Sequence, residues 1–159
     1  QLEVYATDPA TGARMGGALL RKTVGADGMW GPLSVQPGVP LEFVVSAPGY
    51  ATTHIYRSGF PRSSDLVHLR AERMADADKG AESIVTLVRP RGYLDPARDK
   101  MLLDGAQPPG VPPGAGVASA KVKPAGGVRS IAAEFNGERV VGQTWPAASG
   151  HLVFLELTY

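Results

Sequence analysis

Histidines are the first candidates for acid–base or metal chemistry in this 159-residue chain, and there are three of them. His54 and His68 lie in predicted strands beside apolar neighbours, and His151 begins the last predicted strand. Because successive strand residues point to opposite faces, we expect His54 and His68 to face solvent or a domain edge. Histidines this scattered predict no metal site, and the absence of cysteine excludes disulfides and thiolate sites.

Motifs for nucleophilic or phosphate chemistry are missing. The sequence contains no Gly-x-Ser-x-Gly element, which would carry a serine nucleophile, and no Gly-x-x-x-x-Gly-Lys phosphate loop. We therefore expect no catalytic residue and no cofactor in these residues.

Two tryptophans are candidates for a ligand platform. Exposed aromatic rings on β-sandwich modules can hold sugars by covering an apolar sugar face. Trp30 and Trp145 each lie beside Gly or Pro near a strand end, where a Trp more often closes the end of a core. We favour the core interpretation and keep the platform as the alternative.

A cluster of aromatic and arginine residues begins at the last residue of the fourth predicted strand. Tyr56, Arg57, Phe60 and Arg62 have the composition of an interface hot spot. We predict that they leave the sheet together on a loop, where a partner domain would dock. An ordinary solvated loop is the alternative.

These residues would be positioned by short strands. In residues 41–45, which turns flank on both sides, Leu, Phe and Val alternate with Glu42 and Val44, the period of two that is typical of a strand. Further strands are predicted at residues 2–6, 18–23, 51–56, 66–69, 83–88, 100–103, 117–123, 128–135, 139–141 and 151–157.

Turn residues separate the strands. Asn136-Gly137 is the strongest hairpin signal, because a two-residue type I′ turn needs positive φ at both positions, and its strands should pair antiparallel. The Pro-rich residues 107–114 predict a stiff loop, with a recognition loop as the alternative.

Composition fits a folded protein with many turns. Hydrophobic residues make up 43% of the chain and charged residues 19%, with 20 Gly and 14 Pro. The net charge of +1 gives nucleic-acid binding little electrostatic support. No apolar run approaches the roughly 18 residues of a transmembrane helix, and no signal peptide is visible. The chain begins with Gln1, which suggests a piece of a longer protein.

The fold class predicted is all-β, with two small antiparallel β-sandwich-like domains at residues 1–72 and 82–159. Residues 73–81 are the expected linker, because residues 71–82 are the stretch whose composition favours one or two helical turns.

The first seventy residues resemble the transthyretin-like, carboxypeptidase-regulatory-like β-sandwich family. The series that carries the resemblance is Val4, Asp8, Thr11-Gly12, Gly17-Ala18, Asp27-Gly28, Trp30, Pro37-Gly38, residues 41–45 and Ser46-Ala47-Pro48-Gly49-Tyr50. The resemblance implies tight turns at Thr-Gly and Asp-Gly, and a Tyr50 that folds back on the core. It implies no single function, because such modules are attached to many enzymes and surface proteins.

One branch of the wider transthyretin family hydrolyses hydroxyisourate with His and Arg residues and a C-terminal Tyr-Arg-Gly-Ser. Here Tyr56-Arg57-Ser58-Gly59 has its last two residues reversed and lies mid-chain, and the C-terminus reads Leu-Thr-Tyr159. These departures make that enzyme a minor alternative.

Most of the chain is also similar to the C-terminal region of bacterial secreted or periplasmic α/β-hydrolases of lipase or esterase type. The segments that carry this similarity are residues 54–64, 67–70, 89–93, 135–142 and 144–146. The resemblance implies an upstream Ser-His-Asp domain in the same polypeptide and a polymeric or lipid substrate, and it transfers no catalytic residue to this chain.

The leading hypothesis is therefore a non-catalytic accessory region of a lipase- or esterase-like hydrolase, which docks on the catalytic domain or presents substrate. The alternative is a self-standing surface or carbohydrate-binding module that uses Trp30 or Trp145.

Overall fold

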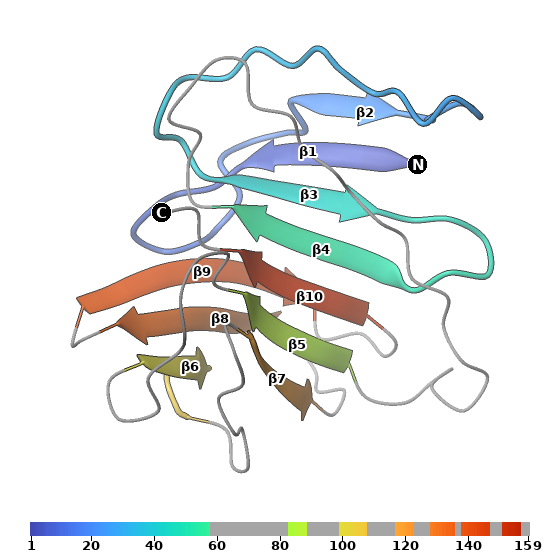
Figure 1. Ribbon diagram of the computed structural model, residues 1–159. Helices are drawn as coiled ribbons and strands as arrows, with labels where there is room; N and C mark the ends of the chain where they lie inside the picture. Colours follow the sequence, from blue (N-terminus) through green and yellow to red (C-terminus); the bar gives the residue numbers. More distant parts are fainter. Residues whose placement is uncertain are drawn as a thin grey trace.

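The computed structural model describes residues 1–57, 83–88, 99–107, 117–122, 128–135, 138–146 and 151–156. Within these ranges the chain forms strands, turns and loops, and no helix. The all-β fold class is confirmed, and the strands form two separate sheets (Figure 1).

Within the described part of the chain, ten strands make up the two sheets. They are β1 Leu2–Ala6, β2 Leu20–Lys22, β3 Leu41–Val45, β4 Thr52–Arg57, β5 Ser83–Val88, β6 Asp99–Leu103, β7 Val117–Val122, β8 Val128–Phe135, β9 Glu138–Pro146 and β10 His151–Glu156. The larger sheet has seven strands in the order β2-β1-β3-β4-β10-β5-β7, and the smaller has three in the order β6-β8-β9.

Strand β10 departs from the expected antiparallel pairing. It runs parallel to both β4 and β5, whereas the other strand pairs are antiparallel. The preceding strand, β9, belongs to the smaller sheet, so β10 is not joined to either neighbour by a hairpin. Without a hairpin to impose reversal, parallel pairing is available to it.

The larger sheet takes strands from both predicted halves of the chain. Strands β1 to β4 come from residues 1–72, and β5, β7 and β10 come from residues 82–159. The predicted linker at 73–81 lies outside the described residues, as do the predicted strand 66–69, His68 and residues 108–114. The division into two domains stays a prediction.

One face of the larger sheet carries the apolar core. The strand register sets Val4 opposite Phe43 and Phe43 opposite Ile55, and all three are buried. The buried core cluster is Leu2, Val4, Ala6, Leu41, Phe43 and Ile55. The segment between β2 and β3 covers this face with partly buried side chains, among them Trp30, Leu33, Val35 and Val39. Burial of these apolar groups is the main force that holds the sheet to its covering segment.

The turn after β3 corrects one expectation. The backbone N–H of Tyr50 donates to the carbonyl of Ala47 at 3.1 Å, and Gly49 takes a φ of 78° that favours glycine. This turn leaves the Tyr50 side chain 40% exposed. Tyr50 therefore does not fold back on the core.

The predicted hairpin pairing in the smaller sheet is confirmed. β8 and β9 pair antiparallel, with Phe135 opposite Glu138. The two turn residues between them, Asn136 and Gly137, lie outside the described part of the chain. The spacing is that of a two-residue hairpin loop.

Candidate functional site

The opposite face of the larger sheet carries a buried row of polar and aromatic side chains. Tyr5 of β1 lies opposite Glu42 of β3, and Glu42 lies opposite Tyr56 of β4. Their exposed fractions are 7%, 0% and 2%. A fully buried carboxylate is costly unless it is paired and hydrogen-bonded, so the partners of Glu42 define this site.

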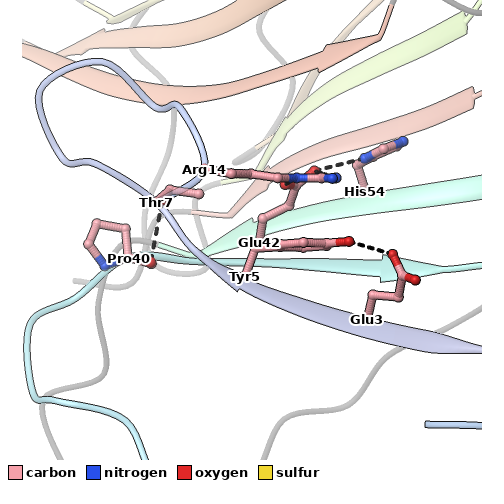
Figure 2. A network of polar contacts seen from close by, with 7 residues as sticks. All are labelled: Glu3, Tyr5, Thr7, Arg14, Pro40, Glu42 and His54. Atoms are coloured by element: carbon pink, nitrogen blue, oxygen red, sulfur yellow. Dashed lines mark hydrogen bonds and ion pairs between the residues drawn. The ribbon is translucent and has the colours of Figure 1, made fainter. Parts of the chain in front are cut away.

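Glu42 binds a cation from one side and a histidine from the other (Figure 2). The Nε of Arg14 donates to its Oε2 at 2.6 Å, and Nη2 of Arg14 lies 3.2 Å from Oε1. Nδ1 of His54 lies 2.8 Å from the same Oε1. His54 is itself buried, while the Arg14 side chain is 35% exposed. Bidentate contact of this kind gives both geometric definition and strength to an Arg–carboxylate pair.

A tight loop after β1 brings Arg14 to this position. Oδ1 of Asp8 accepts hydrogen bonds from the backbone N–H groups of Ala10 and Thr11 at 2.7 and 2.9 Å. The chain then returns to pair Thr7 with Arg14 in an antiparallel bridge. An aspartate that accepts from the next backbone N–H groups is typical of a turn, and the consequence of this turn is that Arg14 lies beside β1.

The network extends outward over Tyr5. The guanidinium carbon of Arg14 lies 3.8 Å from the centroid of the Tyr5 ring, which is a cation–π contact. The Tyr5 hydroxyl donates to Oε2 of Glu3 at 2.6 Å, and Nε of Arg21 donates to Oε1 of Glu3 at 2.7 Å. These outer groups are less buried, since the Arg21 and Glu3 side chains are 63% and 24% exposed. The sign of the charge therefore alternates along the network, from Arg21 near the sheet edge to Glu42 in the buried interior.

The electrostatics keep the central pair charged. Burial alone would raise the pKa of Glu42, but hydrogen bonds from His54 and Arg14, together with their charge, lower it below its usual value. Burial alone would lower the pKa of Arg14, yet the bond to Glu42 raises it. Burial raises the pKa of Tyr56 to about 12, an effect that a hydrogen bond with Thr7 offsets in part. At neutral pH this face therefore holds a carboxylate, a guanidinium and a neutral phenol.

The side chains around Glu42 bind one another, which is a structural role. Both oxygens of Glu42 are engaged by Arg14 and His54, and the neighbouring Thr7 hydroxyl donates to the carbonyl of Pro40 at 3.3 Å (Figure 2). In the described residues no three His, Asp or Glu side chains gather so as to hold a metal ion. The network joins β1, the loop after it, β3 and β4. Its polar contacts need particular partners, whereas apolar packing alone would not decide which residues meet.

The burial of His54 corrects the expectation that it faces solvent. Its side chain is 3% exposed because Glu42, on the adjacent strand, supplies a partner for Nδ1 in the interior. The sequence feature that could have indicated this burial is Glu42, the acidic residue inside the apolar run 41–45, because a buried carboxylate requires basic partners.

The predicted docking residues do not share one loop. Tyr56 is buried within β4, which continues to the half-buried Arg57. This corrects the expectation that both leave the sheet, because the pairing of β4 with β3 and β10 extends through Arg57. Phe60 and Arg62 lie outside the described residues, so a docking role for them stays a prediction.

Trp30 packs against the core, in agreement with the core interpretation. Its ring lies edge-on to Phe43, with centroids 5.7 Å apart and planes at 67°. Such edge-to-face contact is a preferred geometry for buried aromatic pairs. The backbone of Trp145 lies in β9 opposite Arg129, and its side chain is outside the described part.

Acid should weaken the fold through Glu42. Because the folded-state pKa of Glu42 is lowered from 4.5, its stabilisation is complete above about pH 4.5 and is lost as the pH falls through the folded-state pKa. We therefore expect the gap in unfolding free energy between the wild type and Glu42→Gln to narrow steadily below pH 4.5. Urea unfolding at a series of pH values measures this, and a gap independent of pH would contradict it.

One comparison with known proteins matches the part of the chain that carries this site. Residues 1–74 match the family model described as the lipase C-terminal domain, a match that includes β1 to β4 and the whole Glu42 network. No curated protein and no solved structure gives a significant match. In the described residues no helix is long and apolar enough to cross a membrane. The N-terminal part of the chain is thus similar to the lipase C-terminal domain, and this match supports a non-catalytic accessory region of a lipase.

Proposed function

We propose that this chain is the accessory region of a secreted or periplasmic lipase- or esterase-like hydrolase, that it docks on the α/β-hydrolase catalytic domain and that it helps to present a lipid or polymeric substrate. The observation that carries the proposal is the match of residues 1–74 to the lipase C-terminal domain.

The chemistry of the buried face supports a non-catalytic role. A hydrolytic site needs a nucleophile or activated water within reach of a base, and that base must meet substrate. Here His54 and Glu42 are 3% and 0% exposed and bind each other. The same burial disfavours a hydroxyisourate-type enzyme, because Arg14 and His54 are both engaged by Glu42.

Docking is proposed at the segment that follows β4. Phe60 and Arg62 come shortly after Arg57, the last residue of β4. Aromatic and arginine side chains are typical of the residues that dominate interface energy. Trp30, one of the two candidate platforms of the carbohydrate-binding alternative, packs on Phe43.

The first step of the test is to read the gene upstream of Gln1. A Gly-x-Ser-x-Gly element in that reading frame is expected. The variant Phe60→Ala with Arg62→Ala is then expected to weaken binding between separately expressed catalytic and accessory parts about tenfold or more, without lowering the melting temperature. If the double variant in the intact hydrolase lost activity on emulsified substrate and kept its activity on a soluble ester, this result would assign substrate presentation to the segment that follows β4.

Met29→Ala is the matched control, because Met29 is 69% exposed and lies in the segment between β2 and β3. It should change neither affinity nor activity. An upstream frame without a hydrolase motif would refute the proposal. Equal effects of the control and the double variant on affinity would refute the docking segment and leave the rest of the proposal standing.

A further inference from the structure

A long segment without regular secondary structure joins β2 to β3. Because β2 ends at Lys22 and β3 begins at Leu41, the segment covers residues 23–40. In Figure 1 it turns back beyond the end of β2 and returns along that edge of the sheet to the start of β3. Connections this long are uncommon, and those that occur are often lids or binding loops. We call its central part, residues 29–37, the strap.

The middle of the strap is held to the sheet by apolar contacts. Within the described part of the chain, residues 30–35 make no hydrogen bond. The partly buried side chains of Trp30, Leu33 and Val35 pack against the core cluster, while Ser34 is exposed. Local opening costs least where few hydrogen bonds and few buried contacts hold a segment. The strap can therefore leave the face of the sheet without breaking a hydrogen bond.

A tight turn closes each end of the strap. The backbone N–H of Gly28 donates to the carbonyl of Gly25 at 3.0 Å, and that of Val39 donates to the carbonyl of Gln36 at 3.3 Å. Gly28 and Gly38 have φ values of 71° and 81°, which favour glycine. Small residues at the ends of a loop commonly act as hinges of a lid. The strap thus has a fixed turn at each end and a loosely held middle.

The face beneath the strap is entirely apolar. Its buried residues are Leu2, Val4, Ala6, Leu41, Phe43 and Ile55. A sugar or a peptide would leave polar groups unpaired on such a face, whereas an aliphatic chain would not. Along β1 the face extends from Leu2 to Ala6, a rise of about 13 Å, which is close to the extended length of decanoate.

A lysine lies at one end of this apolar face. Lys22 of β2 is the register partner of Leu2, so both side chains project from the same face of the sheet. Lys22 is half-buried, and among the described residues it has no ion pair and no side-chain hydrogen bond. Arg57 lies opposite Leu41 at the other end of the face, but it is already engaged in an interaction of its own. The end of the face near Leu2 therefore favours a negatively charged group.

We propose that the strap is a lid over a binding site for a fatty acid anion. The aliphatic chain takes the place of Trp30, Leu33 and Val35 on the apolar face, and the carboxylate pairs with the ammonium group of Lys22. The closed strap competes with the ligand, so the apparent affinity is reduced by the fraction of molecules in which the strap is closed. This site goes beyond the hydrolase proposal, because it needs neither a catalytic domain nor the segment after β4.

Calorimetric titration of the full chain with decanoate, below the concentration at which it forms micelles, tests the charge pairing. Lys22→Gln should weaken decanoate binding about tenfold and leave the binding of decanol, which carries no charge, unchanged. Arg21→Gln is the matched control, because Arg21 is the adjacent cation on the opposite face, where it binds Glu3. It should leave the affinity for decanoate unchanged.

Thiol labelling tests the displacement of the strap, because the natural sequence contains no cysteine. A maleimide should label Leu33→Cys slowly in the free protein and several-fold faster with decanoate bound, and Val35→Cys is a second reporter of the same event. Met29→Cys should label fast under both conditions, since Met29 is 69% exposed. Ala133→Cys, at a position that is 0% exposed in the smaller sheet, should label slowly under both conditions if the protein stays folded.

Four results would overturn the proposal. The first is that decanoate does not bind. The second is that decanoate binds while labelling of Leu33→Cys and Val35→Cys stays the same or slows, because the strap would then remain closed. The third is an equal loss of decanoate affinity in Lys22→Gln and Arg21→Gln, or a loss in Lys22→Gln that is the same for decanol. The fourth is faster labelling of Ala133→Cys with decanoate, which would show that decanoate unfolds the protein.

Discussion

Replacement of Glu42 by alanine is expected to lower the free energy of unfolding by about 3–5 kcal/mol. The carboxylate is fully buried and binds both Arg14 and His54, so its removal leaves a buried imidazole and a half-buried guanidinium without their acceptor. An unpaired buried polar group costs its full desolvation energy, and this cost exceeds the net gain from forming the pair.

Urea unfolding of the wild type, Glu42→Ala and Glu3→Ala measures this effect against a matched control. Glu3 also binds an arginine, but that pair lies near the surface, so Glu3→Ala should cost about 1 kcal/mol or less. Changing Arg14 together with Glu42 should cost less than the sum of the two single changes, because the two residues share one interaction. Equal losses from Glu42→Ala and Glu3→Ala would show that the buried network does not stabilise the fold.

Local pattern predicted most of the strands. The strands at residues 2–6, 41–45, 83–88 and 128–135 were placed at their observed bounds, because alternation, β-branched residues and flanking turns agree at each. β2 is shorter than expected, and β9 is longer, continuing to Pro146. The extra length of β9 comes from its pairing with β8, which a reading of β9 alone does not include.

Non-local pairing explains what the sequence did not reveal. The position of β10 depends on edges contributed by β4 and β5, and no residue within 151–156 indicates which edges these are. The burial of His54 depends in the same way on the register that brings Glu42 beside it. Arg14 could not be found from spacing, because the turn after β1 decides that it reaches Glu42 at all.

Replacement of Tyr56 by alanine is expected to cost about 3–5 kcal/mol of unfolding free energy, in contrast to the mild effect expected of an exposed docking residue. The ring is 2% exposed and lies beside Glu42 in the buried row. Its removal creates a cavity that the paired strands on either side, β3 and β10, cannot close without a change of register.

Tyr56→Phe separates the ring from its hydroxyl. It keeps the packing and loses the hydrogen bond with Thr7, so we expect a cost of about 1 kcal/mol. The folded-state pKa of Tyr56 is raised to about 12, so the stabilisation from its neutral form is present below pH 10 and is lost as the pH rises toward 12. The wild type should therefore lose more stability than Tyr56→Phe over that interval. If Tyr56→Ala instead kept its melting temperature and weakened binding to a catalytic domain, the ring would lie at the interface. The assignment of Tyr56 to the buried row would then be wrong.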